Sequence, residues 1–295
     1  MIPFVKGHGL GNDYIVIDGD DLPAPLTAPQ TVRICDRNWG VGSDGILLKV
    51  PAWAGADFGM RILNPDGSEA EKSGNGLRIF AKYLWEHGHT KAPVFTVDTK
   101  GGRVECHCHV SDGHMNLVTV EMGTCTFVAP EIPMNGPARE VVRVPLQVGG
   151  ETLLVTAVSV GNPHCVVFVD QLDEARCRAL GPQIEHHPAF PNRTNVQFAK
   201  VMSRAQVDIL IWERGAGYTL ASGSSSSAVA CAAVKNGFCD HGLVTVRMPG
   251  GTLEIDVRPD WSIRLKGPVE EVFTGTFARD LVDALQAPSS RAEGH

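Results

Sequence analysis

Apolar and polar residues alternate along the chain in short runs, and one stretch combines three elements. Apolar residues at 60–63 predict a strand, and the Asn-Pro-Asp-Gly sequence at 64–67 predicts a turn. From Ser73 onward, apolar residues recur at helical spacing, which predicts a helix ending near His87. Free N–H groups at such a helix start attract anions, and nearby glycines let a ligand approach the backbone. An ordinary helix cap is the alternative interpretation.

A second stretch, residues 209–234, repeats this order of strand, Gly-rich turn and helix, and Ser222 stands at the start of its helix. Three pairs of anchors recur in the same order, 149 or 150 positions apart. They are Ser73 with Ser222, Gly101–Glu105 with Gly250–Glu254, and Gly11–Asp13 with Gly161–Pro163. This regularity predicts an internal duplication of one half-domain.

The remaining pattern is mostly strand, with one buried helix per half. Shorter helices are predicted at 31–38 and 172–180, and a final helix at 275–286. The fold class is therefore predicted to be α+β, with two pseudo-symmetric domains that each wrap a β-barrel-like sheet around a central helix. A Pro- and Gly-rich segment, 123–137, indicates the boundary. We expect a first domain at 1–125 joined by helix 275–286, a second at 126–274, and a loose tail at 287–295.

Composition excludes several classes of protein. The 295 residues are 43% hydrophobic, which suits two domains with cores of their own. The formal net charge is -7 without a block of like charges, which disfavours nucleic acid as a partner. No apolar run approaches the roughly 20 residues that a membrane span needs. The N-terminal sequence lacks the apolar region of a signal peptide, so we expect a cytoplasmic protein without a membrane partner.

The eight cysteines are expected to be reduced and mostly buried. The sequence Cys-His-Cys-His at 106–109 suggests a zinc site, but it lies in a predicted strand. There, alternation places Val104, Cys106 and Cys108 on one face and the two histidines on the other. No second pair of ligands accompanies them. We therefore expect no metal.

Five motifs together resemble those of the diaminopimelate epimerases, in order and over nearly the whole chain. They are His8–Asp13, Asn64–Gly76, Gly161–His164, Arg193–Asn195 and Trp212–Gly217. The resemblance implies two β-barrel-like domains around central helices, with the site in the cleft between them. It also implies inversion at Cα of a small amino acid without a cofactor, by two bases on opposite faces. The reaction would convert LL-diaminopimelate to meso-diaminopimelate, a precursor of lysine and peptidoglycan.

By position, the resemblance also assigns the site residues. The substrate carboxylate would rest on two opposed helix N-termini, formed by Gly74, Asn75, Gly223 and Ser224. The rest of the substrate would be held by Asn12, Asn64, Asn162, Asn195, Glu213 and Arg214. The positions of the two bases are those of Ser73 and Ser222, with His164 and Glu213 close to the bases.

These two base positions depart from the family pattern, in which both bases are cysteines. A thiol has an ordinary pKa of about 8.5, and a helix N-terminus can lower it to give a useful thiolate. A serine hydroxyl has a pKa several units higher, and each unit costs about 1.4 kcal/mol. A helix N-terminus returns at most about 2 kcal/mol. A plain two-thiol mechanism should therefore be slowed by orders of magnitude.

Three explanations of the serine pair stay open: a deliberate replacement in an epimerase, a natural branch with other chemistry, and a non-catalytic amino-acid-binding protein. The second includes a divergent isomerase or a dehydratase of another amino acid. In it, His164 oriented by Glu213 could deprotonate Ser222, or a desolvated Lys72 could act as the base. Cys231 lies more than two helical turns beyond Ser222 and cannot replace the thiol. The sequence leaves a homodimer open.

Overall fold

The computed structural model describes residues 2–286, which fall into two units. Unit 1 consists of the residues up to Val118 together with those from Pro268 onward, and unit 2 is Thr119–Gly267. We predicted these boundaries at 125/126 and 274/275, so both lie earlier than expected. The first boundary falls inside one continuous strand, β8 (His114–Thr124), which carries no turn sequence at the crossing. The predicted tail, 287–295, lies outside the described residues.

Unit 1 is built on one sheet. Its strands are β1 (Pro3–Gly9), β2 (Asn12–Asp18), β3 (Ile46–Val50), β4 (Phe58–Leu63), β5 (Glu69–Ala70), β6 (Val94–Thr99), β7 (Gly102–Ser111) and β18 (Glu270–Thr276). Its α-helices are α1 (Ala28–Cys35), α2 (Gly74–Glu86) and α5 (Arg279–Gln286), and a 3-10 turn spans Gly19–Asp21. The strands run in the order β18, β1, β2, β3, β4, after which β5 and β6 both pair with β4, and β7 follows β6.

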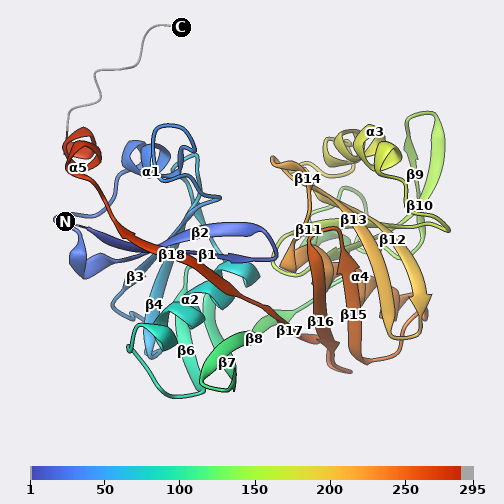
Figure 1. The fold of residues 1–295 in the computed structure, drawn as a ribbon. Coiled ribbons are helices and arrows are strands. Elements are labelled where there is room, and N and C mark those ends of the chain that lie inside the picture. Colours follow the sequence, from blue (N-terminus) through green and yellow to red (C-terminus); the bar gives the residue numbers. More distant parts are fainter. Residues whose placement is uncertain (1, 287–295) are drawn as a thin grey trace, which may run out of the picture. The chain divides into compact units, whose positions relative to one another are not determined.

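Helix α2 is the centre of unit 1, with the strands curving around it (Figure 1). It contacts β1, β2, β7 and β18, and every residue from Gly74 to Leu84 is buried. A helix that is buried all round needs apolar residues on more than one face, and Leu77, Ile79 and Phe80 supply them. The predicted barrel-like sheet around a central helix is confirmed.

The outer face of this sheet is covered by α1 and α5. Ile15 and Ile17 of β2 point toward these helices, where they pack with Ile34 of α1 and Leu285 of α5. Strand β2 is buried on both faces, which explains its unbroken apolar run.

Unit 2 repeats this design with its own elements. Its strands are β9 (Val144–Val148), β10 (Glu151–Ser159), β11 (Pro163–Phe168), β12 (Asn195–Ser203), β13 (Gln206–Glu213), β14 (Gly217–Thr219), β15 (Gly242–Met248), β16 (Gly251–Val257) and β17 (Ser262–Pro268). Its helices are α3 (Glu174–Glu185) and α4 (Gly223–Lys235), with a 3-10 turn at Ala129–Glu131. The strand order is β9, β10, β11, β12, β13, then β14 and β15 on β13, then β16 and β17.

The pairings of the two units agree strand by strand. In unit 1 the parallel pairs are β2 with β3 and β4 with β6. In unit 2 they are β11 with β12 and β13 with β15, at the corresponding places. The central helix of unit 2 is α4, which contacts six strands and is buried from Ser225 to Val234.

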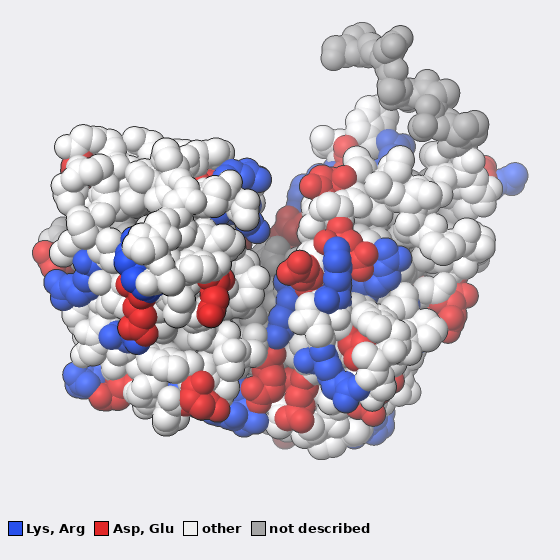
Figure 2. Space-filling model, turned by 180° about the vertical axis from the view of Figure 1, so that it is seen from behind, with Lys and Arg blue, Asp and Glu red and all other residues white. Residues whose placement is uncertain are grey.

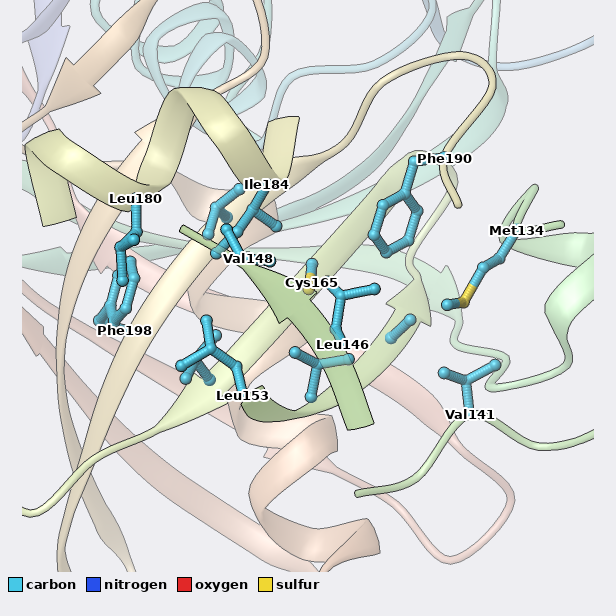
Figure 3. Close-up of a cluster of buried hydrophobic side chains, with 14 of the residues drawn as sticks. Met134, Val141, Leu146, Val148, Leu153, Cys165, Leu180, Ile184, Phe190 and Phe198 are labelled. Atoms are coloured by element: carbon cyan, nitrogen blue, oxygen red, sulfur yellow. The ribbon is translucent and has the colours of Figure 1, made fainter. Parts of the chain in front are cut away.

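The outer layer of unit 2 is a separate hydrophobic cluster beneath α3 (Figure 3). Leu180 and Ile184 from α3 meet Phe198 from β12 and Leu153 from β10. The Pro- and Gly-rich segment 123–137 also contributes to this cluster through Met134 and its neighbours. This burial explains why that segment belongs to unit 2 rather than forming a linker.

Three predicted helices have other bounds in the structure. Helix α1 begins at Ala28 rather than at 31, because Thr27 and Gln30 form a capping box and Pro29 fits the first turn. Helix α5 begins at Arg279 rather than at 275, because the preceding residues pair with β1 as strand β18. Helix α3 runs to Glu185 rather than to 180.

Charges of both signs are interspersed on the surface of each unit on the face shown in Figure 2. The lysines and arginines do not gather there into a broad single-sign patch. Among residues 2–286, no helix is both long and apolar enough to cross a membrane.

Candidate functional site

In unit 1, Ser73 is the N-cap of the central helix α2. Its backbone is extended, with φ -141° and ψ 116°, and its hydroxyl accepts a hydrogen bond from the Gly76 N–H at 3.0 Å. The Tyr14 hydroxyl lies 3.4 Å from the Ser73 hydroxyl. Gly74 and Asn75 follow in the first turn, where N–H groups have no partner within the helix. This is the anion-attracting helix start that the sequence predicted.

A chain of hydrogen bonds between polar side chains starts at Arg78, one turn after the start of α2. The Arg78 guanidinium donates to Asn75 Oδ1 at 2.8 Å, and Asn75 Nδ2 donates to Asn12 Oδ1 at 3.1 Å. Asn12 Nδ2 in turn donates to Asp44 Oδ2 at 2.9 Å. Arg78 is 0% exposed, and its burial lowers its pKa to about 9, so it keeps its charge at neutral pH. The predicted residues Asn12 and Asn75 are therefore in direct contact.

The side-chain hydrogen bond of Asn64 is local and does not join the series from Arg78 to Asp44. Asn64 closes the turn between β4 and β5, where its side chain donates to the Ser68 hydroxyl at 2.9 Å. Its backbone N–H and C=O also bond within that turn. The turn residues that marked this position in the sequence thus form the turn they predicted.

In unit 2, Ser222 is the N-cap of α4 and is buried. Its hydroxyl donates to Glu213 Oε2 at 3.0 Å and accepts from the Ser225 N–H at 3.4 Å. The Ser224 hydroxyl lies 3.5 Å away. Gly223 and Ser224 form the first turn of the helix. A hydroxyl with a carboxylate at hydrogen-bond distance is the arrangement that general-base activation needs.

His164 is fully buried, and each of its ring nitrogens has a hydrogen-bond partner. Nε2 lies 2.9 Å from Asn162 Oδ1, and Nδ1 lies 3.0 Å from Gln197 Nε2. Because the Gln197 amide nitrogen can only donate, Nδ1 accepts and the ring is neutral. Burial, and then the charge of Arg214, lower the pKa of His164 to about 3. The hydrogen bonds of His164 go to Asn162 and Gln197, and Glu213 contacts Ser222 itself, so the hypothesis that His164 takes the Ser222 proton while Glu213 orients it stays a prediction.

This neutral histidine predicts a dependence of stability on pH. The pKa of His164 is lower in the folded state than the ordinary value of about 6.5, so the unfolded state binds more protons below that pH. The free energy of unfolding should therefore fall as the pH drops from about 6.5 toward 3, by up to about 1.4 kcal/mol per unit. Urea denaturation from pH 7 to 4.5 measures this slope.

His164→Gln should reduce that slope by about one proton relative to the native chain. The matched control is His114→Gln, because His114 is exposed. An unchanged slope in His164→Gln would show that another group causes the pH dependence.

Two acceptors hold the turn between β13 and β14, which carries Glu213 and Arg214. Asn195 Oδ1 accepts from the Arg214 N–H at 3.0 Å, while Asn195 Nδ2 donates to Pro163 O. Glu185 Oε1 accepts from the Gly215 N–H at 2.9 Å. Strand β12 places Asn195 directly beside His164 of β11 in the parallel register. The predicted residues of unit 2 are thus neighbours in one network.

Trp212 fixes the same turn from the strand side. Its indole N–H donates to Glu185 Oε2 at 2.8 Å. Its ring packs so closely on α3 that a Cβ at Gly181 would lie 2.6 Å from Trp212 Cγ. Glycine at 181 is therefore required for this approach.

Lys72, the alternative base, is half-buried, and its role stays a prediction. Cys231 is buried in α4, where burial raises the pKa of its thiol. Burial likewise raises the pKa of Cys108 to about 11. Cys106 and Cys108 face the interior of unit 1 with Val104, which confirms the predicted alternation.

Sequence reasoning missed five residues that support the site. They are Tyr14, Asp44, Arg78, Glu185 and Gln197. A local signal existed for Tyr14, which lies two positions after Asn12 on the same strand and hence on the same face. Local signals also existed for Arg78, three positions after Asn75 on the same helix, and for Gln197, two positions after Asn195 on the same strand. Asp44 and Glu185 are brought in by segments distant in the sequence from the residues they contact, which no local pattern indicates.

Comparison with known proteins agrees with this geometry. The family model described as diaminopimelate epimerase matches residues 4–128 and 156–272. Diaminopimelate epimerase 2 of Nostoc sp. is 48% identical over 94% of this chain and 96% of its own length. Diaminopimelate epimerase of Pelotomaculum thermopropionicum is 44% identical over 93% of this chain and 98% of its own length.

Solved structures show the same fold at lower identity. A probable proline racemase from Agrobacterium radiobacter has a TM-score of 0.72 at 17% identity, covering 96% of this chain and 94% of its own. A hydroxyproline epimerase from Agrobacterium vitis has a TM-score of 0.72 at 17% identity, covering 95% and 93%. The sequence matches extend over nearly the whole chain and include both helix starts, Ser73 and Ser222. This chain belongs to the diaminopimelate epimerase family.

Proposed function

We propose that this chain is an isomerase that inverts Cα of LL-diaminopimelate to give meso-diaminopimelate, without a cofactor. The observation that carries the proposal is the contact between Ser222 and Glu213 at the start of α4, where a hydroxyl, a carboxylate and free helix N–H groups converge. Membership of the family supports diaminopimelate as the proposed substrate, because the relatives described above are called diaminopimelate epimerases.

The proton transfers are proposed to run through the two serines. Ser222 Oγ takes the Cα proton while its own proton passes to Glu213 Oε2, and the C–H electron pair stays on the substrate, spread into its carboxylate. Ser73 Oγ–H then supplies a proton to the opposite face of Cα. The Tyr14 hydroxyl, 3.4 Å from Ser73 Oγ, is close enough to stabilise the alkoxide that this step leaves. Solvent restores both groups.

The remaining candidate residues are proposed to bind the substrate. N–H groups at two helix starts would stabilise the negative charge that develops on the substrate carboxylate. These helix starts are formed by Gly74, Asn75, Gly223 and Ser224. The other polar groups of the substrate would be held by Asn12, Asn64, Asn162, Asn195 and Arg214. His164, neutral and buried, would position Asn162 rather than transfer a proton.

A non-catalytic amino-acid-binding protein is the second candidate, and the serine pair favours it. Hydroxyl groups are weaker acids than thiols by several pKa units, so each proton transfer has a higher barrier. Under our proposal the native chain is therefore a slow epimerase, not an inactive one, because Glu213 assists Ser222.

Deuterium exchange at Cα tests the proposal. The native chain is incubated with LL-diaminopimelate in deuterium oxide, and the Cα signals are followed by NMR. We expect slow loss of the Cα signal with formation of the meso isomer, and a further loss of rate in Glu213→Gln. Binding without exchange would contradict catalysis and support the binding protein. Neither binding nor exchange would contradict the proposed substrate.

We further infer that the two units arose by internal duplication, since their strand pairings and helix caps correspond. A place in lysine formation and a cytoplasmic location follow from the proposed reaction. The exclusion of nucleic acid as a partner, and the question of a homodimer, stay predictions from the sequence.

A further inference from the structure

We propose that Arg78 is a positioning residue that fixes the orientation of the Asn75 and Asn12 side-chain amides, so that both present N–H donors to a bound carboxylate. This inference rests on the proposed function for the identity of the ligand. The orientation itself is a property of the free protein and can be tested without it.

The direction of the hydrogen-bond chain follows from its two ends. A guanidinium can only donate, so Asn75 must turn its Oδ1 toward Arg78. Asn75 Nδ2 then faces Asn12 and donates to its Oδ1. An ionised carboxylate can only accept, so Asp44 takes its hydrogen bond from Asn12 Nδ2. Both ends therefore impose the same orientation on the two amides between them.

Each amide uses one of its two N–H groups within this chain. The second N–H of Asn75 and that of Asn12 take no part in this chain of hydrogen bonds, and Asn75 itself lies in the first turn of α2. These donors would match a carboxylate, which only accepts. A flipped Asn75 would offer its oxygen instead and repel the same ligand.

Arg78 is also held so that it cannot turn away. Besides Asn75, it donates to Gly74 O at 3.1 Å and to Pro268 O at 3.2 Å. All three of these acceptors are uncharged, and the side chain is 0% exposed. Burying a cation costs desolvation free energy unless a nearby group stabilises the charge. An anion at the helix start would gain from this charge through the low dielectric of the interior.

The test compares Arg78→Met with Lys82→Met. Lys82 is a matched control because it lies one turn further along α2, is 8% exposed, and donates to Met115 O at 2.6 Å. Its loss removes a buried cation from the same helix without touching the amide chain. Arg78→Lys tests rescue, because it keeps the charge and one donor.

The first readout is the pair of side-chain amide resonances of Asn12 and Asn75 in 15N-labelled protein without ligand, assigned with Asn12→Ala and Asn75→Ala. We expect Arg78→Met to shift both pairs and Lys82→Met to leave them in place, with Arg78→Lys closer to the native spectrum. Unchanged resonances in Arg78→Met, in folded protein, would overturn the proposal.

The second readout is the Kd for LL-diaminopimelate by calorimetry. Arg78→Met should raise it about tenfold or more, since hydrogen bonds to charged groups are worth about 1.5–3 kcal/mol. Arg78→Met and Asn12→Ala should be non-additive in the double variant, because they act through one chain. Additive effects would overturn the coupling. If the native chain does not bind this ligand, the proposed function fails, while the amide readout still decides the orientation.

Discussion

Replacing Ser73 and Ser222 together by cysteine is expected to raise the rate of Cα exchange on LL-diaminopimelate by at least about 10³-fold. The hydroxyl and the thiol differ by several pKa units, and each unit changes the ionised fraction tenfold. Both positions are N-caps, where a helix start stabilises a thiolate further. The measurement is NMR in deuterium oxide, with the native chain alongside.

Single replacements separate proton removal by residue 222 from proton delivery by residue 73. Ser222→Cys alone supplies an efficient base on one side, so exchange should rise more than inversion does. Only the double variant should give exchange and meso product at similar rates. Ser73→Ala/Ser222→Ala is the control for any background reaction, and each variant is checked for an unchanged Tm. If the double-cysteine variant folds and neither exchanges nor inverts diaminopimelate, the substrate assignment is wrong.

Glu185→Ala is expected to lower the free energy of unfolding by about 3 kcal/mol and to weaken binding of diaminopimelate. Glu185 is 3% exposed and accepts hydrogen bonds from the Trp212 indole, the Gly215 N–H and the Arg193 guanidinium. Its removal leaves the Trp212 indole N–H, on a half-buried side chain, and the Gly215 N–H without their acceptor. The turn that carries Glu213 then loses one of its two anchors.

Urea denaturation measures the first effect and calorimetry the second. Glu185→Gln keeps the shape and one acceptor oxygen, so its loss of stability should be smaller. The matched control is Glu174→Ala on the same helix, where the carboxylate is exposed and bonds Arg178 and Tyr218. That variant should change stability little. Equal losses in Glu185→Ala and Glu174→Ala would show that the buried network does not hold the turn.

The helix starts and the inward-facing strand residues could be predicted from the local sequence, because capping and hydrophobic periodicity involve residues close together along the chain. A cap residue followed by glycine and an apolar helical period marks a helix start, and it correctly located α2 after Ser73 and α4 after Ser222. Strict alternation correctly placed Cys106 and Cys108 on the inner face of their strand, with Val104. Repeated anchors predicted one topology used twice, which the strand pairings of the two units match.

Other features were decided by tertiary structure, because they depend on partners far apart in the chain. The unit boundary at Val118 lies within one continuous strand, so no turn residue could mark it. The start of α5 depends on β18 pairing with β1 across almost the entire sequence. His164 resembled a base in sequence, yet burial, and then the charge of Arg214, lower its pKa and keep it neutral.

The sequence by itself determined where the two helix starts lie and which residue types stand there. Only the tertiary structure decided how those residues are used. The carboxylate that contacts Ser222 is Glu213, and the carboxylate that accepts from Asn12 is Asp44. The physical reason is that hydrogen bonding and desolvation act over a few ångströms in space, whereas sequence patterns report only neighbours along the chain.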